Sequence, residues 1–209
     1  MGPMTGLCFT RSRPHSRFVQ NLHISVNIFL LSLDSMGRYG RMMMAERRFL
    51  RKVCMLGEFA VGKTNLANRF SHNVFDERYL TTMGARVTKK EIVIKDANVT
   101  LMIWDLIGFL KYERIIASYV KGSDVGMVVF DVTRDETFAM AEKWANMFLK
   151  DDPKRTVVLL ANKMDLGPKY PAEEQGRQLA EKRGWKFFTT SAKTGQNVEQ
   201  AFLSIAEVE

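Results

Sequence analysis

Eight residues, GEFAVGKT from Gly57 to Thr64, constrain the fold of this chain more than any other feature. They match the pattern G-x-x-x-x-G-K-[ST] and lie between an apolar run and a helical pattern, as that motif requires. Backbone N–H groups and a helix N-terminus can surround phosphates there. The Lys63 ammonium would reach the β- and γ-phosphates, and the Thr64 hydroxyl would bind Mg²⁺. The motif, called the phosphate loop below, therefore predicts a nucleoside-triphosphate site in an α/β fold.

Apolar runs alternate with helical patterns from residue 51 onward, which predicts a mostly parallel sheet with helices on both faces. The predicted strands are residues 52–56, 87–94, 99–104, 125–130, 156–161 and 185–190. The predicted helices are residues 63–71, 112–121, 135–150, 171–183 and 198–208. Because the turn-forming residues 95–98 separate the second strand from the third, we expect a hairpin there and one antiparallel edge strand.

A second motif, NKMD at residues 162–165, follows the fifth predicted strand and indicates guanine. The Asp165 carboxylate can accept hydrogen bonds from guanine N1–H and from the exocyclic amino group, which adenine does not offer. Leaving this carboxylate unpaired against another base costs free energy, so the discrimination between guanine and adenine can be large. The segment SAK at residues 191–193 follows the last predicted strand and would supply the remaining base contact. Placed downstream of a phosphate loop, this guanine motif favours GTP and GDP as ligands.

Further short motifs occur in a family-specific order. TMG at residues 82–84 precedes the second predicted strand, DLIG at residues 105–108 follows Trp104, and residues 130–138 read FDVTRDETF. With the phosphate loop and the guanine motif, they make residues 49–209 resemble a Ras-superfamily small GTPase of the Rab-like type found in prokaryotes. The resemblance implies a P-loop NTPase with a Ras-like G domain, whose six-stranded sheet is mostly parallel.

The resemblance also implies roles for single residues. Phe75 would pack against guanine, and the Ala192 N–H would contact the guanine carbonyl. Thr82 would sense Mg²⁺ and the γ-phosphate, Asp105 would hold Mg²⁺ through water, and the Gly108 N–H would touch the γ-phosphate. The expected nucleotide-binding residues are Gly57, Glu58, Phe59, Ala60, Val61, Gly62, Lys63, Thr64, Asn65, Phe75, Thr82, Asp105, Gly108, Asn162, Lys163, Asp165, Ser191, Ala192 and Lys193. The expected metal ligands are Thr64, Thr82 and Asp105, and the expected catalytic residues are Lys63, Thr82 and Gly108.

Two phenylalanines depart from the family pattern beside the expected γ-phosphate. The glutamine that orients the attacking water in the family is replaced by Phe109, and a small phosphate-loop residue is replaced by Phe59. The rings either crowd the space for the water and for a partner's arginine, or pack on each other or on switch II, the segment that begins at DLIG. In the second case another residue would handle the water, with Lys111, Glu113 and Arg114 as the nearby polar candidates. Nucleotide binding is therefore expected, with slow GTP hydrolysis.

The implied function is a molecular switch that binds GTP and GDP with Mg²⁺. Residues 72–87 and 106–119 would be the switch segments that recruit an effector in the GTP state, and an exchange factor and an activating protein would act on them. The alternative is a GTP-bound scaffold that does not hydrolyse its nucleotide. A single-turnover hydrolysis assay separates the two.

The net charge of +8 lies mostly in the N-terminal extension and its junction with the predicted G domain of residues 46–209. Residues 1–52 hold nine Lys and Arg against two acidic residues, whereas residues 53–209 hold 22 basic and 21 acidic residues. The charge therefore does not favour a nucleic-acid partner. The histidines and the two cysteines are scattered without metal-ligand or disulfide spacing, and no apolar run is long enough for a membrane span.

Residues 1–45 are predicted to be an N-terminal extension. Arginines precede an apolar run at residues 24–33, as in a signal peptide, but polar residues interrupt the run and no small-x-small cleavage site follows. Three interpretations stay open. Translation starts further downstream, at Met36 or within residues 42–44; the segment is an amphipathic surface anchor; or it is a disordered or packed extension.

Lipid attachment signals are not apparent at either end. The chain ends at Glu209 without a cysteine for prenylation, and Gly6 stands where a myristoylation signal needs Ser or Thr. We therefore expect a cytoplasmic protein without a prenyl anchor, in which the N-terminal extension is the one candidate for membrane contact.

Overall fold

The computed structural model describes residues 47–77, 82–95 and 97–207 of the chain. The predictions for the N-terminal extension lie outside these described residues. Within them, no helix is long and apolar enough to cross a lipid bilayer.

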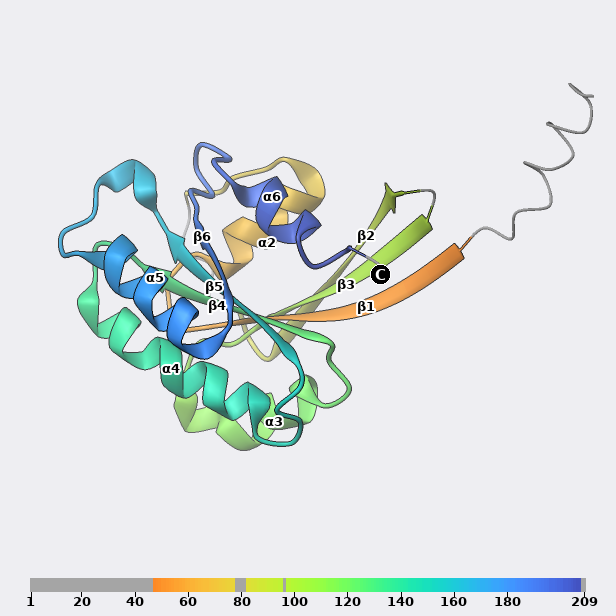
Figure 1. Ribbon diagram of the computed structural model, residues 1–209, viewed down its shortest axis with the longest axis horizontal. Helices are drawn as coiled ribbons and strands as arrows, with labels where there is room; N and C mark the ends of the chain where they lie inside the picture. Colours follow the sequence, from red (N-terminus) through yellow and green to blue (C-terminus); the bar gives the residue numbers. More distant parts are fainter. Residues whose placement is uncertain (1–46, 78–81, 96, 208–209) are drawn as a thin grey trace, which may run out of the picture. The chain divides into compact units, whose positions relative to one another are not determined.

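Six strands form one sheet in the order β2-β3-β1-β4-β5-β6 (Figure 1). Their bounds are β1 Arg47–Leu56, β2 Ala85–Ile94, β3 Ala97–Leu106, β4 Val125–Asp131, β5 Thr156–Asn162 and β6 Lys186–Thr189. All neighbouring strands are parallel except β2 and β3, which pair antiparallel at one edge. The predicted sheet, including its hairpin and antiparallel edge strand, is confirmed.

Strand β1 begins at Arg47, five residues before the predicted start at residue 52. Its first residues pair in register with β3, from Arg47 opposite Ala97 onward. Three arginines in this stretch interrupt the apolar pattern by which a strand is recognised in the sequence, because their side chains are exposed or half-buried. Pairing with the long β2–β3 hairpin, a tertiary contact, therefore extends the strand.

The described residues also form five helices and two short 3₁₀ turns, of which α6 follows the last strand and the others connect strands. Their bounds are α2 Lys63–His72, η1 Leu110–Tyr112, α3 Glu113–Val120, α4 Asp135–Leu149, η2 Met164–Leu166, α5 Ala172–Arg183 and α6 Val198–Leu203. The last helix ends at Leu203, so the predicted end at residue 208 is wrong. The Ser204 hydroxyl donates to the Ala201 carbonyl oxygen and the Lys186 ammonium donates to the Ser204 carbonyl oxygen. These bonds satisfy helix-end carbonyls and close the helix at this point.

Helices α2 and α6 cover one face of the sheet, and α3, α4 and α5 cover the other (Figure 1). Alternate residues of β1 enter the two cores: Val53 and Met55 face α2 and α6, whereas Cys54 and Leu56 face α3 and α4. Strand β4 is buried along its whole length, as a central parallel strand must be. The carboxyl ends of the parallel strands lie at one edge of the sheet, where such folds bind their ligands.

Candidate functional site

The phosphate loop turns sharply between β1 and α2, and its two glycines make that turn possible. Gly57 and Gly62 have φ angles of +132° and +103°, which side-chain-bearing residues rarely adopt. A Cβ at Gly57 would also collide with the Val129 backbone, and one at Gly62 with the Asn162 side chain. The glycines of the motif are therefore required by local conformation and by close approach of β4 and β5.

Lys63 lies buried inside this loop. Its ammonium donates to the carbonyl oxygens of Gly57 at 2.8 Å and Glu58 at 2.9 Å. Burial lowers the pKa of Lys63 to about 8, although the carboxylates of Asp105 and Glu58 act in the opposite direction. A Cβ at Gly108 would lie 2.5 Å from the Lys63 ammonium. The DLIG segment can therefore approach the phosphate loop this closely only because its last residue is glycine. The centre of the loop is thus a buried cation that an anionic ligand would stabilise.

Three side-chain oxygens meet beside this cation, from the predicted metal ligands Thr64, Thr82 and Asp105. The two threonine hydroxyls donate to Asp105 Oδ2 at 2.6 Å and 3.1 Å, and they lie 3.2 Å from each other. Asp105 Oδ1 is buried without a hydrogen-bond partner among the described residues, and burial raises the pKa of this carboxyl despite the threonine bonds. Hard oxygen donors around an unsatisfied carboxylate fit Mg²⁺.

This cluster contains a single carboxylate. Over the part of the chain that the structure describes, no group of three or more His, Cys, Asp or Glu residues could hold a metal ion. Mg²⁺ usually binds through one or two protein carboxylates together with substrate phosphates and water. The cluster therefore fits a magnesium ion that arrives with a phosphorylated ligand.

The guanine motif lies at the other end of the site. The buried Asn162 side chain donates to the Val61 carbonyl oxygen at 2.9 Å and accepts from the Ala192 N–H at 3.3 Å, so it joins the phosphate loop to the SAK segment. The exposed Asp165 carboxylate accepts from the Ser191 hydroxyl at 2.6 Å. This bond orients the carboxylate that sequence reasoning selected for base recognition.

A cavity of about 500 Å³ runs between these two ends. The predicted binding residues that line it are Phe59, Ala60, Gly62, Lys63, Thr64, Asn65, Phe75, Thr82, Gly108, Asn162, Lys163, Asp165, Ala192 and Lys193. The other five predicted residues, Gly57, Glu58, Val61, Asp105 and Ser191, are not among the lining residues. Of these, Glu58 accepts a hydrogen bond from Trp144 Nε1 of α4 at 3.0 Å. The volume is in the range of small-molecule sites.

The phosphate-loop end of the cavity carries an aromatic stack. The rings of Phe59 and Phe109 lie nearly parallel, 14° apart in orientation, with their centroids separated by 5.1 Å. The Lys111 ammonium lies 5.5 Å from the centroid of Phe109 and 5.1 Å from that of Tyr112. The two phenylalanines that depart from the family pattern therefore pack on each other, and a cation covers one of them.

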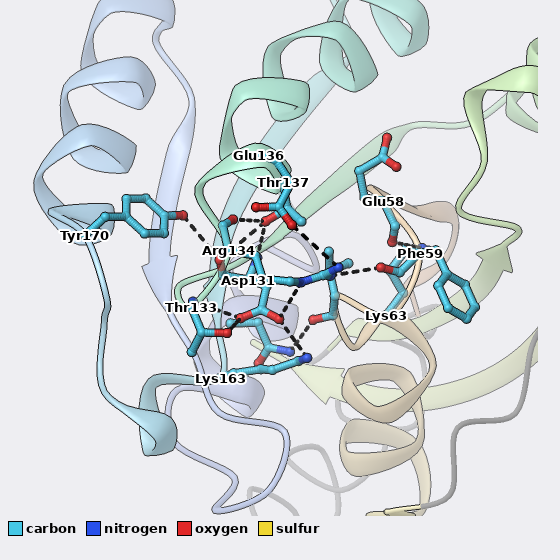
Figure 2. A network of polar contacts seen from close by, with 12 residues as sticks. Glu58, Phe59, Lys63, Asp131, Thr133, Arg134, Glu136, Thr137, Lys163 and Tyr170 are labelled. Atoms are coloured by element: carbon cyan, nitrogen blue, oxygen red, sulfur yellow. Dashed lines mark hydrogen bonds and ion pairs between the residues drawn. The ribbon is translucent and has the colours of Figure 1, made fainter.

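Asp131, at the carboxyl end of β4, organises a polar network that sequence reasoning missed (Figure 2). Its side chain is 1% exposed, and Oδ2 accepts from the Lys163 ammonium at 2.7 Å and from Arg134 Nε at 3.2 Å. Oδ1 accepts from the Thr133 N–H and hydroxyl. Although burial raises it, the bonds from Lys163 and Thr133 hold the pKa of this carboxyl below its usual value. The sequence signal that could have revealed this network is an acidic residue at the end of an otherwise apolar strand.

Arg134 extends this network to the phosphate loop. Its Nη2 donates to the Phe59 carbonyl oxygen at 2.9 Å. We call the chain from Lys163 through Asp131 and Arg134 to the Phe59 carbonyl the Asp131 bridge.

Arg69 of α2 is a second residue that the sequence did not single out. It donates to the carbonyl oxygens of Ala192 at 2.8 Å and Lys193 at 2.6 Å. Arg69 thus connects the helix that begins at the phosphate loop to the SAK segment.

The chain is similar in sequence to several known proteins. The Ras family model matches residues 52–208. Ras-related protein RABA6b of Arabidopsis thaliana is 38% identical over 162 residues, covering 77% of this chain and 71% of the relative. Ras-related protein Rab7 of Glycine max is 37% identical over 174 residues, covering 79% and 84%. Ras-related protein Rab-25 of Homo sapiens is 38% identical over 164 residues, covering 77% and 76%.

Proposed function

The chain belongs to the Ras family and is a Rab-like, GTP-binding small GTPase, and from this premise we propose that it is a molecular switch with slow GTP hydrolysis. The observation that carries the slow rate is the aromatic stack at the phosphate-loop end of the cavity. The family uses a glutamine there to orient the attacking water. A phenyl ring has no group that holds a water molecule.

The phosphates of the proposed ligand lie against the backbone N–H groups of the phosphate loop. Lys63 contacts the outer phosphates, and Thr64, Thr82 and Asp105 hold Mg²⁺. Bound Mg²⁺ supplies positive charge that offsets the charge of the β- and γ-phosphates. The buried ammonium and the unsatisfied Asp105 oxygen support this arrangement, because each needs an oppositely charged partner.

The guanine base lies at the end of the cavity formed by Phe75, Lys163 and Asp165. The Asp165 carboxylate accepts hydrogen bonds from the base, and its own bond from Ser191 holds it in place. A preoriented acceptor loses less conformational entropy on binding, which favours both affinity and specificity for guanine.

Hydrolysis at this site is slow for two reasons. The rings of Phe59 and Phe109 pack on each other, and we infer that this packed pair also occupies the space in which a water or a partner's arginine would act. The polar neighbour Lys111 is engaged with the rings, and its cation cannot act as a base. Of the remaining candidates for positioning the water, Glu113 lies in the first turn of α3, where its side chain is exposed.

The switch property rests on Thr82 and on the DLIG segment. The Thr82 hydroxyl and the Gly108 N–H respond to a γ-phosphate, so the segments around them adopt a different conformation in the GTP state and recruit an effector. An exchange factor and an activating protein complete the cycle. Cytoplasmic localisation and the boundary between the extension and the G domain at residues 45 and 46 stay predictions.

A GTP-bound scaffold is the second candidate, and the same aromatic stack favours it. The test uses the purified full chain. The bound nucleotide is identified by chromatography, and GTP conversion is followed in a single turnover with excess Mg²⁺. We expect guanine nucleotide and a rate on the order of 10⁻⁴ s⁻¹ or below. No detectable conversion would favour the scaffold, and a rate far above this range would contradict the proposed role of the stack.

A further inference from the structure

We propose that Arg134, held by Asp131, is a positioning residue for the phosphate loop and thereby sets how long the protein retains a guanosine diphosphate. The inference rests on the proposed function, because it concerns the nucleotide bound in that cavity. It assigns a role to two residues outside the nucleotide motifs.

The Asp131 bridge connects the two loops that would hold opposite ends of the nucleotide (Figure 2). Lys163 belongs to the guanine motif and Phe59 to the phosphate loop, and both are tied to one buried carboxylate, directly or through Arg134. The three distances are 2.7, 3.2 and 2.9 Å. Hydrogen bonds from a charged group are stronger than neutral ones, and the Asp131 carboxylate that anchors the bridge is buried, whereas the bond from Arg134 to Phe59 lies at the surface. The bridge therefore fixes the spacing between the two loops.

The bond to Phe59 controls the orientation of one particular backbone N–H. A trans peptide is planar, so the Phe59 carbonyl and the Ala60 N–H point in opposite directions. With the carbonyl directed at Arg134, the Ala60 N–H is directed away from it, and Ala60 lines the cavity. Arg134 thus orients a phosphate-loop donor without contacting the ligand itself.

Ala60 requires this external support. Its φ angle is +61°, in the left-handed region that alanine disfavours because of its Cβ. Without a restraint on the preceding carbonyl, the peptide between Phe59 and Ala60 is expected to rotate toward a relaxed conformation. The loop would then present a carbonyl oxygen, which repels phosphate, in place of an N–H.

An arginine suits this position better than a lysine. Arg134 uses two different nitrogens, Nε for Asp131 and Nη2 for the Phe59 carbonyl. A lysine ammonium carries the same charge but lacks the planar fork that serves both partners at fixed geometry. Arg134 is also not among the described residues that line the cavity. If substitution of Arg134 weakens nucleotide binding, the cause is therefore not a lost contact between Arg134 and the nucleotide.

The test measures dissociation of a fluorescent GDP analogue from the full chain in excess unlabelled GDP. The variants are Arg134→Met, Arg134→Lys and the control Arg177→Met, which removes an exposed pair with Glu173 on α5. We expect Arg134→Met to release GDP about 10-fold faster or more, because a charge-assisted bond to a strained backbone is lost. Arg134→Lys should be intermediate, and Arg177→Met should match the wild type.

GMP separates a role in the phosphate loop from a merely structural one. GMP keeps the base but lacks the outer phosphates around which the loop wraps. Arg134→Met should therefore weaken GDP binding about 10-fold and leave GMP binding nearly unchanged. Equal losses for both nucleotides, or a lower unfolding temperature with unchanged GDP release, would overturn the inference. A wild type that binds neither nucleotide would instead overturn the proposed function, and this inference with it.

Discussion

The two ends of the nucleotide cavity hold their side chains by different means. At the guanine-motif end, directional hydrogen bonds join Asp165 to Ser191 and Asn162 to the backbone of both neighbouring loops. At the phosphate-loop end, Phe59 and Phe109 make an apolar contact where the family has a small residue and a glutamine. Directional hydrogen bonds select a ligand with matching donors and acceptors, whereas packed rings exclude water without selecting a particular ligand. Guanine recognition and turnover therefore depend on different side chains of one cavity.

The largest expected effect comes from Lys63, because both nucleotides need it. In Lys63→Met a buried cation that faces the phosphates is lost, so we expect GTP and GDP affinities to fall about 100- to 1,000-fold. Calorimetric or fluorescence titration measures both constants. The control Lys154→Met removes an exposed charge in the loop after α4 and should have no effect. Intact GDP binding by Lys63→Met would contradict the placement of the phosphates.

The pH dependence of binding sharpens the assignment of Lys63. Phosphate binding favours the protonated amine, and the pKa of Lys63 in the free protein is about 8. Affinity is therefore full below pH 8 and declines as pH rises through that value. We expect GDP to bind about 10-fold more weakly at pH 9 than at pH 7, in line with proton linkage. Lys63→Met should lack this decline; an equal decline in the variant would assign it to another group.

Asp165→Asn tests the guanine-motif end alone. The amide replaces an acceptor with a donor, so we expect GDP affinity to fall about 10- to 100-fold and xanthosine diphosphate affinity to rise. Competition titration with the two nucleotides measures the change in preference. Asp151→Asn, an exposed substitution in the loop before β5, at the end of that strand opposite to the motif, is the control. An unchanged preference would show that another group reads the base.

The smallest effect is expected where the aromatic stack replaces the family's glutamine. Phe109→Gln restores a water-positioning group but leaves Phe59 in place, so we expect only a few-fold rise in single-turnover GTP hydrolysis. Combining it with Phe59→Gly should raise the rate further and non-additively, because both changes act on one space. Leu110→Gln introduces the same side chain one residue away and should not help. If the wild type hydrolyses GTP rapidly and Phe109→Gln slows this hydrolysis, the aromatic stack serves catalysis.

The sequence alone determined the order of elements and the identity of the nucleotide motifs. Each of these is a local pattern: an apolar run predicts a buried strand, the glycines of residues 57–64 predict a sharp turn, and NKMD after a strand predicts a guanine contact. The antiparallel edge strand also followed locally, from the turn between β2 and β3. Such features depend on neighbours a few residues apart, which a sequence displays directly.

Which side chains meet across the cavity depends on the tertiary structure. Arg134 and the Phe59 carbonyl are 75 residues apart, and the Asp131 carboxylate reaches Lys163 from a different strand. These contacts exist because β1, β4 and β5 are neighbours whose carboxyl ends share one edge of the sheet. The stacking of Phe59 on Phe109 and the lowered pKa of Lys63 have the same origin. Both depend on burial and on distances through space, which strand order sets and which no local pattern of residues encodes.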